Sequence, residues 1–238
     1  MDLFSVEALL GVLTLTVMEI VLGIDNIIFI AIIANKLPKH QQPKARRIGL
    51  TLALVVRVAF LLGITTLIKF KDPLFTVFDI PLSGKDLILM GGGIFLVIKS
   101  LMEILEKLST HEKEKVLNAK NAMSAIIMQI VLIDIVFSFD SILAAVALVK
   151  EVEIMIAAVV VSMIIMMLFS GPIADYINKR PSLQILALSF LVLIGVMLFT
   201  EAIHHPLEKE YIYSAVVFAL LVELVNLKME KNQKIKGE

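Results

Sequence analysis

Long apolar stretches alternate with short polar segments along the whole chain. Each stretch is close to the ~20 mostly apolar residues that an α-helix needs to cross the hydrocarbon core of a bilayer. Strands of a membrane barrel would instead alternate apolar and polar residues, which these stretches do not do. The pattern predicts seven membrane-spanning helices, at about residues 7–34, 48–68, 86–105, 122–149, 152–174, 183–203 and 211–227.

Composition agrees with a multi-pass, all-α membrane protein. Of the 238 residues, 59% are hydrophobic and the mean hydropathy is +0.94, too apolar for a soluble globule to cover its own surface. Cysteine is absent, which excludes disulfides and thiolate metal sites, and the four histidines fall in predicted loops. The acidic N-terminus, with Asp2 and Glu7, does not resemble a cleavable signal peptide. We therefore expect a single membrane domain over residues 1–238.

The distribution of lysine and arginine predicts the orientation of the chain. Basic residues resist translocation and therefore mark cytoplasmic loops. With the N-terminus outside, the cytoplasmic segments contain fifteen lysines and arginines and the outer loops contain five. The loop from Lys36 to Arg47 alone contains five of the fifteen. We expect a protein of the cytoplasmic membrane with its N-terminus outside and its C-terminus in the cytoplasm.

The first and fourth stretches share a motif. Residues 19–28 read EIVLGIDNII and residues 134–143 read DIVFSFDSIL, so in both an acid precedes an aspartate by six residues and a small polar residue follows. The copies lie in the first and fourth predicted spans, so each repeat contains three crossings, and an odd number of crossings inverts the second copy relative to the first. We expect an inverted repeat of three plus three helices with a seventh helix appended. Its parts are a first repeat at 1–106, a cytoplasmic linker at 107–121, a second repeat at 122–206, and the last helix and tail at 207–238.

The motif places acids inside predicted spans. A charged side chain at the centre of a membrane costs about 2.5–3.5 kcal/mol on insertion scales, so each acid must face protein, water or an ion. On an ideal helix Glu19 shares a face with Asn26, and Asp134 shares a face with Ser141.

The second aspartate of each copy requires a choice of geometry. Asp25 and Asp140 point about 120° away from the acid that precedes them. Either both helices present oxygen atoms to two surfaces, or they unwind near Gly23 and Ser138 so that the acids converge.

The charge balance favours a divalent cation. Arg57, in the second span, is the expected partner for one carboxylate, which leaves a formal charge of minus three on the remaining acids. One divalent cation and one proton would balance it. Oxygen ligands suit Mn(II), Mg(II) and Ca(II), whereas zinc and copper sites generally use histidine or cysteine. A purely structural ion-pair network is the alternative, although one arginine cannot pair with four acids. The predicted metal ligands are Glu19, Asp25, Asn26, Asp134, Asp140 and Ser141.

Three further features of the spans lead to smaller predictions. Lys99 and Glu103, one turn apart, are expected to form a structural salt bridge. The glycines at 91–93 are expected to permit close helix packing. Glu223 and Asn226 share one face of the last helix and are candidates for lining an ion path.

The motif residues resemble those of the TerC family of integral membrane proteins. The resemblance rests on residues 19–38, on Ala-Arg-Arg at 45–47, on residues 134–142, on Tyr-Ile-Tyr at 211–213 and on residues 223–226. It implies a relation to the lysine exporter superfamily and a role in exporting manganese or in protecting against metal excess. It also implies that the six predicted ligands occupy the acidic motif positions of the family.

The leading hypothesis is a secondary transporter that exports a divalent cation, with Mn(II) favoured over Ca(II) and Mg(II) and with protons as a candidate counter-ion. The alternative is an assembly or metallation factor that docks other proteins in the membrane without a transport cycle. The sequence leaves a homodimer and membrane-protein partners open. We do not expect an enzyme, because the spans lack nucleophile, phosphate-loop and cofactor motifs, and we do not expect nucleic-acid binding.

Overall fold

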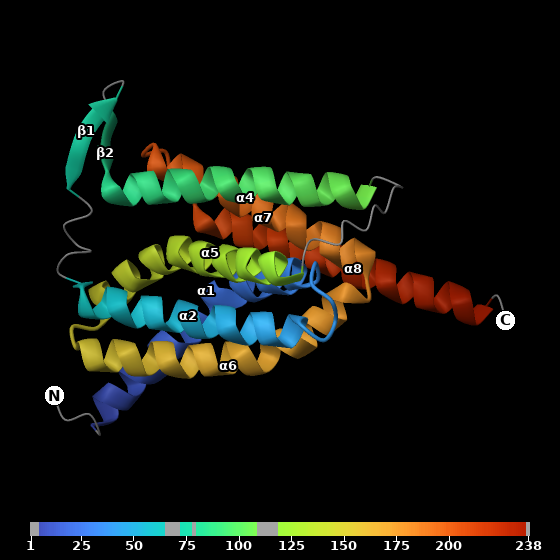
Figure 1. Cartoon of the computed structure of the whole chain (residues 1–238), viewed down its shortest axis with the longest axis horizontal. Coiled ribbons are helices and arrows are strands. Elements are labelled where there is room, and N and C mark those ends of the chain that lie inside the picture. The colour runs from blue at the N-terminus through green and yellow to red at the C-terminus, as the bar shows by residue number, and fades with distance from the viewer. Residues whose placement is uncertain (1–4, 65–71, 78–79, 109–118, 237–238) are drawn as a thin grey trace.

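Long helices make up almost all of the computed structural model, which describes residues 5–64, 72–77, 80–108 and 119–236 (Figure 1). They lie roughly parallel or antiparallel in one bundle. The helices are α1 (Val6–Ala34), α2 (Gln42–Leu62), α4 (Gly84–Leu108), α5 (Ala119–Leu148), α6 (Val152–Asn178), α7 (Pro181–Ala202) and α8 (Lys209–Lys236).

Each of the seven apolar stretches forms a helix within the described residues, so the all-α prediction is confirmed, while residues 65–68 of the second stretch lie outside the described part of the chain. Among the described residues, five helices are long and apolar enough to cross a membrane: α1, α4, α5, α6 and α7. The described part of α2 carries Arg46, Arg47 and Arg57 among its last eighteen residues, which lowers its apolar content. Crossing of the membrane by α2 and α8 stays a prediction.

Two helices in the first half begin with side-chain caps. Ser5 precedes α1, and its hydroxyl accepts a hydrogen bond from the backbone N–H of Ala8. Ser83 and Asp86 form a reciprocal capping box at the start of α4: the backbone N–H of Asp86 donates to Ser83 Oγ at 3.2 Å, and the backbone N–H of Ser83 donates to Asp86 Oδ2 at 2.8 Å. The caps satisfy backbone groups that helix ends leave unpaired.

A two-stranded antiparallel hairpin precedes α4, and the sequence analysis did not predict it. Strand β1 (Pro73–Val77) pairs with β2 (Ile80–Ser83), and the hairpin stands beyond one end of the bundle (Figure 1). The segment was missed because its strands are short and follow the apolar stretch that was assigned to the second span.

Helices α4 and α7 pack antiparallel and very closely. Lys85 at the start of α4 pairs with Glu201 at the end of α7, with 2.7 Å between Nζ and Oε1. Near the middle the two backbones meet: a Cβ built on Gly93 would lie 2.6 Å from the carbonyl oxygen of Gly195, and one built on Gly195 would lie 2.8 Å from that of Gly93. Neither position has room for a side chain.

The prediction that the glycines at 91–93 permit close packing is confirmed for two of the three. A Cβ on Gly92 would lie 2.4 Å from Val136 of α5, in addition to the contact that Gly93 makes with α7. The prediction is wrong for Gly91, because a Cβ at that position would meet no atom of the described residues within 4 Å.

The motif helices α1 and α5 are continuous. Both are α-helical throughout their length, including the positions of Gly23 and Ser138, so the unwinding that would make both acids of a copy converge is wrong. Gly23 has a different use. A Cβ there would lie 2.6 Å from Met166 Sδ, so the glycine lets α1 approach α6. The alternative, in which each helix presents oxygen atoms to two surfaces, stays a prediction, because the side chains of Asp25 and Asp140 lie outside the described residues.

Candidate functional site

Three helices bring charged side chains together in the core. Arg57 of α2 lies between Glu19 of α1 and Asp134 of α5, and all three side chains are no more than 3% exposed. Arg57 Nη2 donates to Asp134 Oδ1 at 2.9 Å, and Arg57 Nε donates to Asp134 Oδ2 at 3.0 Å. Arg57 Nη1 donates to Glu19 Oε2. We call these three residues the Arg57 cluster.

Arg57 therefore contacts more carboxylates than predicted, although its single positive charge still balances only one of them. The prediction that it partners one carboxylate is wrong, since its planar guanidinium reaches two carboxylates from different sides. The formal charge of the Arg57 cluster is minus one. A guanidinium carries five N–H donors in a fixed fork, which explains how a single arginine can bridge the two repeats of the motif.

Asn26 extends the Arg57 cluster by one residue. Its Nδ2 atom lies 3.5 Å from Asp134 Oδ1, at the outer limit of a hydrogen bond, and the residue is 3% exposed. The prediction that Glu19 and Asn26 share a face of α1 is confirmed, because both side chains reach the partners that α2 and α5 provide.

Two buried oxygen atoms at this site have no hydrogen-bond partner in the described part of the chain. They are Glu19 Oε1 and Asn26 Oδ1. A buried acceptor that lacks a donor loses its hydration without compensation, at a cost of about 1–3 kcal/mol. Such atoms in a buried acidic site are candidates for coordinating a ligand that is not a hydrogen-bond donor.

The side chain of the second aspartate in each motif copy lies outside the described residues. This applies to Asp25 and Asp140, although the backbone of both belongs to continuous helices. Ser141 is 5% exposed, and its hydroxyl donates to the backbone oxygen of Ser138 at 3.3 Å. Within the described residues no group of three or more His, Cys, Asp or Glu is placed to hold a metal ion.

Charged residues at the ends of the helices form separate ion pairs. Lys36, in the loop after α1, lies 2.5 Å from Glu103 and 3.0 Å from Glu106 of α4. Burial lowers the pKa of Lys36, but the hydrogen bonds to the two glutamates outweigh it and the pKa is raised. The predicted salt bridge from Lys99 to Glu103 is confirmed at 3.4 Å. Sequence alone gave no signal for Lys36, because its partners lie on a helix far along the chain.

Polar contacts also join the helices at this end of the bundle. Asn35, after α1, and Asn178, the last residue of α6, exchange amide hydrogen bonds. Lys107 near the end of α4 donates to Gln184 of α7.

The structure places the two candidate path residues on α8, which packs against α7. Glu223 accepts a hydrogen bond from Ser182 Oγ of α7, and Asn226 is exposed. Neither observation connects them with the Arg57 cluster, so an ion path along this face stays a prediction.

Relatives of known sequence cover nearly the whole chain. A "UPF0053 protein" of Haemophilus influenzae is 42% identical over 230 residues, which is 96% of this chain and 97% of the relative. The "UPF0053 inner membrane protein YgdQ" of Escherichia coli K12 is 42% identical over 229 residues, or 96% of each chain. The "UPF0053 inner membrane protein YoaE" of the same strain is also 42% identical, over 93% of this chain but only 43% of that relative. No solved structure matches significantly.

The family assignment follows from a match along almost the entire length. A profile described as "Integral membrane protein TerC family" matches residues 4–236, which include the Arg57 cluster and every helix of the bundle. Together with the relatives named as inner membrane proteins, this match establishes that the chain belongs to the TerC family of integral membrane proteins.

Proposed function

We propose that this protein is a secondary transporter that exports a divalent metal cation through a carboxylate site between α1 and α5. Mn(II) is the cation that we favour. The observation that carries the proposal is a pair of buried oxygen atoms beside Asp134, Glu19 Oε1 and Asn26 Oδ1, which have no hydrogen-bond partner within the described part of the chain. A cation that entered there would find carboxylate and amide oxygens already removed from water. Sites of this composition suit Mn(II), Mg(II) and Ca(II).

Arg57 acts in this proposal as a tethered counter-ion. With no metal bound, its guanidinium holds Glu19 and Asp134 and so reduces the penalty of burying two carboxylates. A divalent cation would compete with it for the same oxygens. Asp25 and Asp140, on the same two helices, would supply the further negative charge that a doubly charged ion needs. Protons that return to these carboxylates are the proposed counter-ion.

The pairing of the helices supports an inverted repeat of α1, α2 and α4 with α5, α6 and α7. The most extensive contacts are those of α4 with α7, α1 with α6, and α2 with α5. Exchanging the two halves turns the α1–α6 pair into the α5–α2 pair and leaves the α4–α7 pair unchanged. Glu19 and Asp134, the first acids of the two motif copies, then approach Arg57 from equivalent helices. Such an arrangement would put the proposed ion site at the interface between the two proposed repeats.

The acids near the ends of α4 and α7 follow the same exchange, but their lysine partners do not, because Lys36 follows α1 whereas Lys85 lies at the start of α4. Glu103 near the end of α4 and Glu201 near the end of α7 each pair with a lysine from another segment, Lys36 and Lys85 respectively. Because α4 and α7 are antiparallel, the two pairs lie at opposite ends of the bundle. With the basic loop before α2 assigned to the cytoplasm, the pair of Lys36 and Glu103 is on the inner side and the pair of Lys85 and Glu201 on the outer side.

Ion flux into proteoliposomes tests the proposal. The purified chain should carry Mn(II) faster than protein-free vesicles, and Asp134→Asn should reduce that flux at least tenfold while the protein stays folded. Asp25→Asn and Asp140→Asn should have the same effect. The matched control is Glu153→Gln on α6, which neutralises an exposed glutamate and should leave the flux unchanged. Parallel measurements with Mg(II) and Ca(II) give the selectivity.

Unchanged Mn(II) flux in Asp134→Asn would refute the proposed site. An absence of Mn(II), Mg(II) and Ca(II) flux in the wild-type protein, together with a membrane protein that co-purifies at fixed stoichiometry, would instead favour a role in assembly or metallation.

A further inference from the structure

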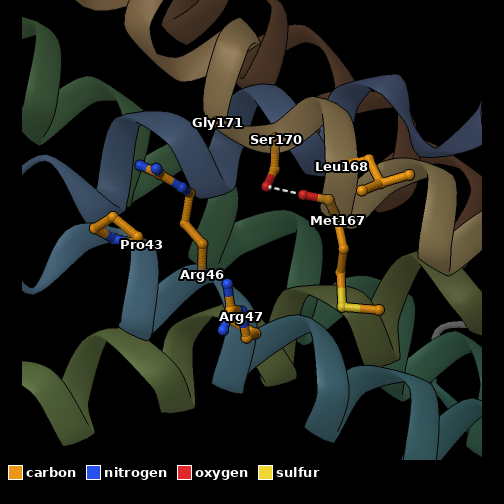
Figure 2. Close-up of a pocket in the computed structure, with 7 residues that line it drawn as sticks. All are labelled: Pro43, Arg46, Arg47, Met167, Leu168, Ser170 and Gly171. Carbon is orange, nitrogen blue, oxygen red and sulfur yellow. Dashed lines mark hydrogen bonds between the residues drawn. The ribbon is translucent and has the colours of Figure 1, made fainter.

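A second polar site lies between α2 and α6, at the end of the bundle where α2 begins. It is a pocket of about 130 Å³, whereas a single water molecule requires roughly 10–15 Å³ on the same measure. Figure 2 shows its lining. One side comes from the first turns of α2, with Pro43, Arg46 and Arg47, and the other from α6, including Leu168 and Gly171.

Arg46 is the residue that makes this pocket unusual. Its side chain belongs to the pocket lining although the residue is only 7% exposed, and its Nη1 atom has no hydrogen-bond partner among the described residues. Burial lowers the pKa of Arg46 from its ordinary value, and the charge of Asp175 only partly opposes the shift. Arginine stays charged in proteins, so the pocket contains a buried cation with unused donor capacity.

The start of α2 adds further positive potential. Gln41 at the N-cap makes no side-chain capping bond, and the first turn contains no acidic residue. The helix dipole places partial positive charge at this end, which favours an anion, although Pro43, the first-turn residue that lines the pocket, has no backbone N–H to donate. In this helix the first turns instead carry Lys44, Arg46 and Arg47. Cations at that end are unfavourable unless an anion offsets them.

We infer that this pocket binds the phosphate group of an anionic phospholipid. The guanidinium groups of Arg46 and the neighbouring Arg47 would hold the phosphate oxygens, since arginine binds phosphate with paired, charge-assisted hydrogen bonds. On the orientation proposed above, the lipid belongs to the inner leaflet, where anionic headgroups concentrate. The inference does not depend on the transport of an ion.

Apolar side chains next to the pocket distinguish a lipid from free phosphate. Leu168, which lines the pocket, is 69% exposed, and the adjacent Phe169 is 55% exposed. A headgroup seated on Arg46 would leave its acyl chains to lie against this exposed apolar surface of α6. A free phosphate ion would gain nothing from these contacts, because it has no apolar part.

Native mass spectrometry of the delipidated protein tests the inference. The wild type should retain one phosphatidylglycerol more tightly than phosphatidylcholine, and equimolar inorganic phosphate should not displace it. Arg46→Gln should weaken phosphatidylglycerol binding about tenfold or more, as expected for the loss of a charge-assisted hydrogen bond. The matched control is Lys44→Gln, which removes an exposed charge from the same turn without touching the pocket lining and should change binding less than twofold.

A second variant fills the pocket and keeps every charge. A Cβ on Gly171 would meet only the Arg46 Nη2 atom, at 3.9 Å, so Gly171→Leu can place its side chain in open space and should also weaken binding about tenfold. Three results would overturn the inference: no saturable phosphatidylglycerol binding to the wild type, equal displacement by inorganic phosphate, or binding within twofold of wild type in both variants. The first two need no variant, so they decide the matter even if a substitution impairs folding.

Discussion

Replacing Arg57 by methionine is expected to destabilise the protein through the acids it leaves behind. Methionine keeps much of the length of the side chain but removes the guanidinium. Glu19 and Asp134, 2% and 3% exposed, would then be buried without a counter-charge. Removing one partner of a buried ion pair costs about 3–5 kcal/mol, and here one substitution deprives two carboxylates. We therefore expect Arg57→Met to lower the free energy of unfolding by an amount at or above the upper end of that range.

Neutralising Asp134 alone should lower the free energy of unfolding less than replacing Arg57 does. Asp134→Asn leaves Arg57 paired with Glu19 at zero net charge and removes the charge from one set of hydrogen bonds, a loss of about 1.5–3 kcal/mol. In the double variant only Glu19 remains without a counter-charge, so the penalty falls on one buried carboxylate instead of two. The double variant should therefore be more stable than the sum of the two single losses predicts, by about 1–3 kcal/mol.

The assay is equilibrium unfolding in mixed micelles, with helical circular dichroism as the readout and the four proteins compared at one pH. Exposed Glu153→Gln provides the control for loss of a carboxylate as such. The reasoning fails if Arg57→Met unfolds at the same denaturant fraction as the wild type. It also fails if the effects of the two substitutions simply add, because the guanidinium and Asp134 would then not be energetically coupled.

Two further predictions follow from the packing and from the proposed ion site. Gly93→Ala should lower the free energy of unfolding by about 1–3 kcal/mol, because its Cβ would lie 2.6 Å from the Gly195 oxygen. The control, Gly91→Ala, should be neutral or stabilise the protein by up to about 1 kcal/mol. Equal effects of the two substitutions in the same unfolding assay would contradict the close contact. Mn(II) at one hundred times its dissociation constant should stabilise the wild type by about 2.7 kcal/mol but leave the stability of Asp134→Asn unchanged, as measured by thermal unfolding. Equal stabilisation of both proteins would mean that the ion binds elsewhere.

The sequence predicted the helices well because their signal is local. Apolar length alone located the seven helices, with boundaries that differ mainly where polar residues continue a helix beyond its apolar part, as at the start of α2 and the end of α8. The hairpin of β1 and β2 was missed because short strands leave little periodicity to detect. The Ser83 and Asp86 capping box is visible in the sequence as a serine three residues before an aspartate, but apolar length, which put the start of that span at residue 86, does not reveal it.

The site was predicted in part, for a physical reason. Helix geometry correctly placed Glu19 and Asn26 on one face, because that relation depends only on residues in one helix. The number of carboxylates that Arg57 reaches depends on how α1, α2 and α5 pack, and no local pattern contains that information. The same holds for Lys36 and Glu103, which are joined only by the tertiary fold. Whether Asp25 and Asp140 complete an ion site stays a prediction.

The contact between Gly93 and Gly195 restricts how relatives of this protein can diverge. Each glycine occupies its position because the carbonyl oxygen of the other fills the volume of a methyl group. Glycine is the smallest residue, so a larger side chain at one position cannot be accommodated by a reduction at the other. Substitution there requires α4 and α7 to move apart. We therefore expect the two glycines to persist together across lineages even where the proposed ion site differs, since they determine the spacing of α4 and α7.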